Sequence, residues 1–170
     1  VDALGSLSLV IASRLRGDQP VTGSSLVLEE VAFVLATLAT VTIDLDPGHN
    51  GGEAAVRLAG HPPPLLLSGG SVVTVPTRHG PVLGVFDDAD RPASRFPLGG
   101  PDWALLMYTD GLIEARSGDQ FFGEERVAAA VRRSADVAPK VLCKSLLDAA
   151  TEFSEDGLHD DVTVLAVRQR

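Results

Sequence analysis

The amino-acid sequence predicts an α+β domain in which helices pack on antiparallel sheet. Residues 37–45 and 161–168 alternate between apolar and polar positions and are rich in β-branched residues, so each range predicts a strand. Residues 124–133 and 140–153 are predicted to form helices. Short strand–turn–strand patterns precede these helices. They favour hairpins over the strand–helix–strand units of a parallel sheet.

The N-terminal part of the chain is predicted to hold two further helices. Apolar residues recur at roughly helical spacing over residues 2–16, and Gly17 and Pro20 end that pattern. After a polar loop at residues 17–25, the apolar segment 26–36 is expected to form the second helix.

Two hairpins are expected in the next part of the chain. The strand at residues 37–45 leads into the turn formers of 46–52, and residues 54–60 form the returning arm. Three prolines at 62–64 exclude both helix and central ladder pairing, so this stretch is a rigid connector. The glycines at 69–70 mark a second hairpin between two short apolar runs.

The region before the predicted C-terminal helices contains one clear strand. Residues 76–102 are rich in glycine and proline and hold only short apolar pieces. The run WALLMYT at 103–109 is predicted to be a strand. No glycine-rich phosphate loop follows a predicted strand, so a nucleotide-binding fold has little support.

The composition fits one globular domain and narrows the classes of partner. The 170 residues are 45% hydrophobic and 22% charged, with a formal net charge of -9 at pH 7. A surface this acidic argues against nucleic acid or an anionic membrane and is compatible with a cation site. The longest apolar stretch, residues 26–43, contains Glu29 and Glu30, so no transmembrane helix is expected. A single cysteine, Cys143, cannot form a disulfide within the chain, which suits a cytoplasmic location.

Carboxylates stand at the ends of two predicted strands. Asp110 follows the strand at 103–109 and precedes Gly111. Asp160 and Asp161 precede the last strand. Mg²⁺ and Mn²⁺ prefer oxygen ligands, and carboxylates from different strand ends can converge on one ion while the sheet holds them. Spacing alone favours the simpler interpretation that each acidic residue belongs to an ordinary turn.

Five motifs occur in order along the chain. They are AGHPPPLLL at 59–67, GPVLGV at 80–85, LLMYTDGLIEAR at 105–116, FGEERV at 122–127 and HDDVTVLAVR at 159–168. Together they resemble the SpoIIE/RsbU-type serine phosphatases, a branch of the metal-dependent (PPM, or type 2C) protein phosphatases. The resemblance runs from about residue 40 to the C-terminus and is weaker over the N-terminal segment. It implies an antiparallel β-sandwich flanked by helices, in α-β-β-α layers.

The resemblance also implies an activity. Such enzymes remove phosphate from phosphoserine or phosphothreonine on a partner protein. In this branch the partner resembles a phosphorylated anti-anti-sigma factor, within a bacterial partner-switching circuit that regulates sigma factors in stress response or development. Two Mn²⁺ or Mg²⁺ ions would hold a bridging water that attacks phosphorus directly, without a phosphoenzyme.

Individual residues receive roles from the same resemblance. Asp110 in YTDG and Asp160 in DDVT correspond to metal ligands. Asp161 is expected to support the site, and Gly111 to let the backbone turn sharply beside the ion. Thr109 is either a hydroxyl that supports the ligands or, as we favour, a core or ladder residue.

His61 in AGHPPP is expected to be a buried histidine that tethers the proline connector through hydrogen bonds. A direct catalytic role for His61 is the less favoured alternative. The 4 histidines are scattered without a paired spacing, so no zinc site is expected.

Two carboxylate-bearing segments of the family, similar to GGDFYD and GDVSGHG, do not occur in this sequence. Residues 1–170 are therefore interpreted as a single phosphatase domain that lacks its N-terminal part. Two alternatives to an enzyme stay open, namely a non-catalytic, metal-poor module that docks a sigma-factor regulator, and an inactive fragment. A fragment would expose sheet edges through which two copies could pair as a homodimer.

Overall fold

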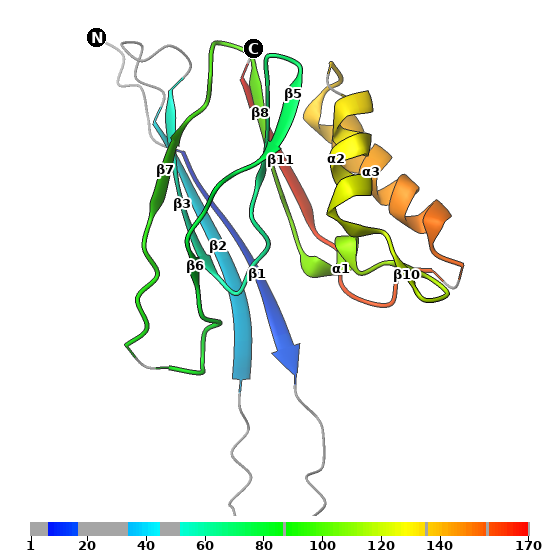
Figure 1. Ribbon diagram of the computed structural model, residues 1–170, viewed down its shortest axis with the longest axis horizontal. Coiled ribbons are helices and arrows are strands. Elements are labelled where there is room, and N and C mark those ends of the chain that lie inside the picture. Colours follow the sequence, from blue (N-terminus) through cyan, green and yellow to red (C-terminus); the bar gives the residue numbers. More distant parts are fainter. Residues whose placement is uncertain are drawn as a thin grey trace, which may run out of the picture.

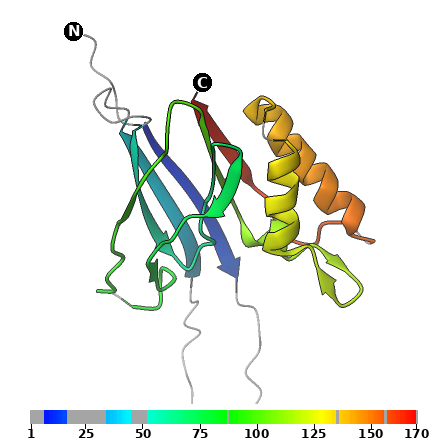
Figure 2. The same cartoon turned by 45° about the horizontal axis from the view of Figure 1, so that its top comes forward.

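Two sheets lie face to face, and a pair of helices covers the outer face of one of them (Figures 1 and 2). In this computed structural model the described residues are 7–16, 34–44, 52–86, 88–134, 136–155 and 157–169. The architecture is the α+β sandwich that the sequence predicts, with layers in the order sheet, sheet, helices. Within the described ranges, no helix covers the outer face of the first sheet, the face where the fourth layer is expected.

The first sheet is built mainly from antiparallel strands. It contains β1 (Leu7–Arg16), β2 (Val34–Asp44), β3 (Glu53–Ala59), β6 (His79–Gly80) and β7 (Ser94–Pro97). The order is β1-β2-β3-β6, and β7 also pairs with β3. The short β6 runs parallel to β3, whereas the other pairings are antiparallel. Alternate residues of β2, including Val41 and Ile43, are buried against the second sheet.

The second sheet is antiparallel throughout. It contains β4 (Leu65–Ser68), β5 (Ser71–Thr74), β8 (Trp103–Tyr108) and β11 (Val164–Gln169), in the order β11-β8-β4-β5. The hairpin between β4 and β5 turns at Gly69 and Gly70, whose φ angles of 56° and 77° lie in the left-handed region that favours glycine.

Strand β8 is buried on both faces, which explains its unbroken apolar sequence. All six of its residues are buried. Successive side chains of a strand point to opposite faces. Trp103, Leu105 and Met107 therefore join the core between the sheets. Ala104, Leu106 and Tyr108 join the core beneath the helices.

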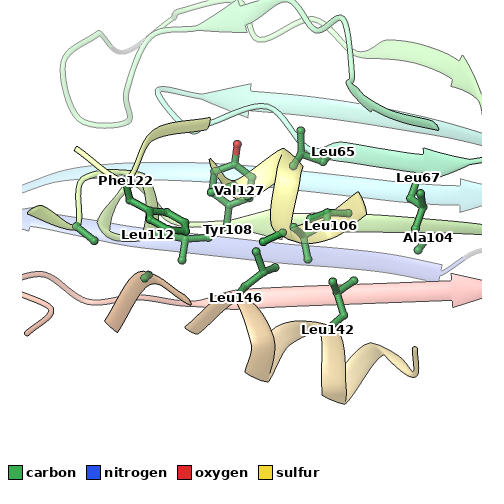
Figure 3. Packing of buried hydrophobic residues seen from close by; sticks show 14 residues of the cluster. Leu65, Leu67, Ala104, Leu106, Tyr108, Leu112, Phe122, Val127, Leu142 and Leu146 are labelled. Carbon is green, nitrogen blue, oxygen red and sulfur yellow. The ribbon is translucent and has the colours of Figure 1, made fainter. Parts of the chain in front are cut away.

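The helical layer consists of α2 (Gly123–Arg133) and α3 (Pro139–Phe153). Each helix buries one stripe at helical spacing, represented by Val127 and Val131 in α2 and by Leu142 and Leu146 in α3. These side chains pack on the second sheet, and Figure 3 shows Val127, Leu142 and Leu146 among them. Pro139 occupies the start of α3, where the missing N–H costs nothing.

A short helix and a small hairpin connect β8 to α2. Helix α1 (Asp110–Ile113) begins two residues after β8 ends. It is followed by β9 (Arg116–Ser117) and β10 (Gln120–Phe121), which pair in antiparallel register. Figure 1 shows this hairpin beside the lower ends of the two helices.

Most of the predicted elements are confirmed. The strand at 37–45 corresponds to the main part of β2, and the returning arm at 54–60 is β3. The proline connector at 62–64 joins β3 to β4 without regular structure. The predicted helices at 124–133 and 140–153 are α2 and α3, each extended by one residue at its start.

The two predicted N-terminal helices are wrong where the structure describes them. Residues 7–16 form β1, and residues 34–36 belong to β2. The physical reason is long-range pairing, because β1 and β2 join through ten consecutive residue pairs. The apolar spacing of 2–16 was compatible with a helix, and tertiary context overrides so weak a local preference. The remaining parts of these predictions, including the loop at 17–25 and most of the turn at 46–52, lie outside the described residues.

The last strand starts later than predicted. The pattern at 161–168 suggested a strand from Asp161, whereas β11 begins at Val164. Residues 161–163 form a loop whose backbone is bonded to Thr109 instead of to a neighbouring strand. Among the helices that the structure describes, none has the length and apolar content needed to cross a membrane.

Leu106 provides a test of the core beneath the helices. Its side chain is 1% exposed and lies between β8 and the helical layer (Figure 3). We expect Leu106→Ala to lower the free energy of unfolding by about 2–5 kcal/mol, because it removes buried methyl groups and leaves a cavity. Urea unfolding would measure the change. Val73→Ala on the exposed face of β5 is the matched control, and an equal loss in both variants would contradict the assignment.

Candidate functional site

The pairing of β8 with β11 brings the two predicted acidic segments to one edge of the molecule. Tyr108, at the end of β8, lies opposite Val164, at the start of β11. The residues that follow β8 and those that precede β11 therefore emerge side by side. Asp110 and Asp160 belong to these two segments, so the sheet brings together two acidic segments that are far apart in sequence.

Thr109 joins the two segments through three hydrogen bonds. Its backbone N–H donates to the Thr163 carbonyl at 3.0 Å. Its hydroxyl donates to the Asp161 carbonyl at 3.0 Å and accepts from the Thr163 N–H at 2.9 Å. Thr109 is 2% exposed, so these bonds are shielded from water. The side chain thus acts as a buried ladder residue that fixes the loop carrying Asp160.

Gly111 allows the two segments to approach closely. A Cβ atom at this position would lie 2.8 Å from the Asp161 carbonyl oxygen and 3.3 Å from the Asp160 Cβ. The first distance is too short for a real contact with backbone. Gly111 lies within α1 and does not have a positive φ. From the sequence we expect glycine here because of a sharp turn. The structure gives a different reason, which is direct packing of Gly111 against the second acidic segment.

Both candidate carboxylates are held at one oxygen and open at the other. Asp110 is half-buried, and its Oδ1 accepts a hydrogen bond from the Gly111 N–H at 3.1 Å. Asp160 is exposed, and its Oδ1 accepts from the Asp161 N–H at 2.8 Å. The described residues make no further hydrogen bond or ion pair with either carboxylate. Asp161 contributes through its backbone, while its side chain is exposed.

His61 lies buried behind this edge, in the connector between β3 and β4. It is 2% exposed, and its Nδ1 lies 3.3 Å from the Thr37 hydroxyl on β2. Burial lowers the pKa of His61, while the charge of Asp110 and the Tyr108 backbone act in the opposite direction. Among the described residues, His61 Nε2 has no hydrogen-bond partner. This arrangement fits a tether from β2 to the proline connector.

A shallow pocket of about 440 Å³ opens beside Asp160. It is lined by Gly111, Glu114, Ala115, Arg116, His159 and Asp160. Asp110 is not among the lining residues. The sequence did not single out Glu114 or Arg116. The sequence feature that could have pointed to Arg116 was the turn pair Gly118-Asp119, because this pair predicts a hairpin that begins at Arg116.

The ligand atoms at this edge are of the type that a hard cation prefers, but the described residues supply too few of them for a complete site. Carboxylate oxygens are the ligands that Mg²⁺ and Mn²⁺ take in proteins. Asp110 and Asp160 present open oxygens of this type. However, no three residues among His, Cys, Asp and Glu in the described part of the chain come together as a metal-binding group. The described residues therefore supply part of a ligand set, and water or other side chains would have to complete it.

Solved structures define the fold. The PP2C domain of SiaA from Pseudomonas aeruginosa is similar with a TM-score of 0.66 and 20% identity, over 85% of this chain and 55% of that chain. The serine/threonine phosphatase of S. agalactiae is similar with a TM-score of 0.66 and 11% identity, over 99% of this chain and 89% of that chain. The fold is that of a PP2C-type phosphatase domain.

Sequence similarity defines the family. The profile for stage II sporulation protein E (SpoIIE) matches residues 2–170. The chain belongs to the SpoIIE family, as the five motifs predicted. The RsbU and RsbW domains of a Mycobacterium tuberculosis protein share 34% identity over 79% of this chain, with a TM-score of 0.61. This chain spans 36% of that protein chain and 55% of the SiaA chain. No curated protein matches it in sequence.

The Thr109 hydroxyl can be tested by an isosteric change. We expect Thr109→Val to lower the free energy of unfolding by about 1–3 kcal/mol, because a buried N–H and a carbonyl lose their partner. Thermal unfolding would measure stability, and faster amide exchange at Thr163 would locate the change. Thr151→Val is the control, since that exposed hydroxyl bonds only within α3, to the Leu147 carbonyl. Unchanged exchange at Thr163 would contradict the role of Thr109.

His61 predicts a pH dependence of stability. Its pKa in the folded chain is lowered from 6.5, so the unfolded chain binds this proton more readily. Its contribution to stability is therefore fully present above pH 6.5 and is lost as pH falls below that value. We expect acidification from about pH 7.5 to about pH 5 to destabilise the unsubstituted protein more than His61→Gln. Urea unfolding at both pH values would show this, and equal pH dependence in the two proteins would contradict it.

Proposed function

We propose that residues 1–170 belong to a single Mn²⁺- or Mg²⁺-dependent protein-serine/threonine phosphatase domain. Its reaction would be hydrolysis of phosphoserine or phosphothreonine on a partner protein. The observation that carries this proposal is the meeting of Asp110 and Asp160 at one edge, fixed by Thr109. Membership of the SpoIIE family supports the same chemistry.

In this proposal, Asp110 and Asp160 hold a divalent cation through the oxygens that no described residue engages. Gly111 keeps the two segments close enough to share it. When bound, such a cation lowers the pKa of a coordinated water and neutralises charge on the phosphoryl oxygens. Similarity to a SpoIIE phosphatase domain from Bacillus subtilis that was presoaked with Mn supports this choice of metal.

The proposed substrate is a phosphorylated regulator of the anti-anti-sigma type, in a cytoplasmic partner-switching circuit. The similarity to a protein with RsbU and RsbW domains supports this partner class. The formal net charge of -9 disfavours nucleic acid as an alternative partner.

A second candidate function is a non-catalytic module that binds a regulator without turnover. The observation in its favour is that the described residues do not assemble a complete metal-binding group. A fold of this class can be kept while its chemistry is lost, because function resides in the site and not in the fold. An inactive fragment that pairs through its sheet edges is the third alternative.

Metal binding separates these functions. We expect the full-length protein to bind Mn²⁺ in a calorimetric titration, and Asp110→Asn and Asp160→Asn each to weaken that binding by more than about tenfold, since each removes an anionic ligand. Asp148→Asn on α3 is the matched control, because it removes the same charge from an exposed residue paired with Lys144. Hydrolysis of a phosphoserine peptide would be followed in the same proteins.

The outcomes point to different functions. Mn²⁺ binding with hydrolysis, both lost in the two aspartate variants, supports the phosphatase. Mn²⁺ binding without hydrolysis supports the metal site and contradicts the catalytic activity, whereas absence of both supports the metal-poor binding module. A full-length protein that does not bind Mn²⁺ contradicts the phosphatase proposal.

A further inference from the structure

We propose that Arg116 binds the phosphoryl group of the substrate. Its side chain lines the pocket beside Asp160, at the base of the β9–β10 hairpin. The inference rests on the proposed phosphatase function and adds to it a substrate-binding residue outside the acidic segments.

The charge of the pocket requires such a residue. A phosphorylated side chain carries nearly two negative charges at neutral pH. The pocket itself presents the carboxylates of Glu114 and Asp160, and the whole chain has a formal net charge of -9. Of the residues that line this pocket, Arg116 is the one whose side chain stays positively charged at any working pH. It can therefore offset the repulsion that an entering phosphate meets.

The Arg116 guanidinium is held against an aromatic ring. Arg116 and Phe121 lie directly opposite each other in the hairpin register. The guanidinium carbon lies 4.4 Å from the centroid of the Phe121 ring. This contact with the ring does not use the N–H donors of the guanidinium. Its N–H groups point outward in the plane and can still donate to phosphate oxygens in the forked arrangement that arginine provides.

The hairpin that carries Arg116 is anchored on several sides. At its base, the Phe122 N–H donates to the Ala115 carbonyl at 2.7 Å. On one side, the Ser117 hydroxyl donates to Glu155 Oε1 at 3.0 Å. On the other side, the Arg126 guanidinium donates to the Phe121 carbonyl at 3.0 Å. These bonds hold the β9–β10 hairpin in place before a ligand binds, which reduces the entropy lost on binding.

No residue that the structure describes engages the donors of Arg116. Within the described part of the chain, its guanidinium makes no hydrogen bond and no ion pair. This holds although Glu114 and Asp160 line the same pocket. Arg116 is also exposed, so a ligand can reach it. The arrangement differs from that of Arg95, an exposed arginine that pairs with Glu53 at 2.8 Å.

The alternative is that Arg116 only stabilises the hairpin through its contact with Phe121. The two roles differ in what they change. A purely structural arginine would affect stability and leave ligand affinity unchanged. A phosphate-binding arginine would affect ligand affinity at nearly constant stability, because an exposed stack of this kind contributes only about 0.5–1 kcal/mol.

The test measures binding of a phosphate-ester analogue that cannot be hydrolysed. Phenylphosphonate would be titrated by calorimetry into the full-length, Mn²⁺-loaded protein. We expect Arg116→Gln to raise its Kd about tenfold, and Arg116→Lys to have a smaller effect because lysine keeps the charge and loses the fork. Arg133→Gln removes the same charge from an exposed position on α2 and is the matched control. We expect Mn²⁺ affinity to be unchanged or higher in Arg116→Gln, since a positive charge near the carboxylates is removed.

Failure of this inference can be told apart from failure of the proposed function. If the unsubstituted protein hydrolyses a phosphoserine peptide and Arg116→Gln keeps the same Kd for phenylphosphonate, the inference is wrong and the phosphatase proposal stands. An equal rise in Arg133→Gln would also overturn it, because the effect would then follow net charge alone. If the unsubstituted protein neither binds Mn²⁺ nor hydrolyses the peptide, the proposed function fails and the inference fails with it.

Discussion

The antiparallel pairing of β8 with β11 is the constraint on which the rest of the structure depends. Six consecutive residue pairs join the two strands. Because side chains alternate between faces, a slip of one residue would move each apolar side chain of β8 from its own core to the core on the other face. Both cores are therefore packed as observed only in this register. At the far end, Trp103 donates to Gln169 at 2.7 Å, and the Arg168 guanidinium pairs with Asp102 at 3.0 Å. The register is thus specified by packing and by polar contacts together.

The candidate site is a direct consequence of this register. Where the strand pairing ends, Thr109 continues it with hydrogen bonds to a loop that is not itself a strand. Gly111 then removes the one side chain that would keep the acidic segments apart. The two carboxylates are consequently carried by segments at the end of the sheet, which the hydrogen bonds of Thr109 and the close packing at Gly111 hold together. Preorganisation of this kind is what a cation site requires, because its ligands repel each other in the absence of the ion.

Under the proposed function, the surroundings of the site would let an acidic protein accept an anionic substrate. Hairpin β9–β10 adds an arginine to a pocket that otherwise holds carboxylates. The stack on Phe121 positions the guanidinium without neutralising it. Behind the edge, His61 is buried, and burial lowers its pKa, which disfavours a positive charge on its ring. In the two proposals, attraction for metal and attraction for phosphate thus belong to separate elements of the fold.

Local patterns sufficed wherever neighbouring residues decide the structure. The sequence by itself determined the apolar strand β8, the helices α2 and α3, and the glycine-marked hairpin turn. The roles of Asp110 and Asp160 as candidate ligands came from the resemblance to a family, because spacing alone fits ordinary turns. It misassigned residues 7–16, because a short apolar run satisfies helix and strand spacing alike and only pairing with β2 decides between them. The tertiary structure alone decided that the two acidic segments meet and that close packing requires Gly111. It also decided that Arg116 lines the pocket beside Asp160. The reason is that these contacts join residues as far as 54 positions apart, which no local pattern encodes.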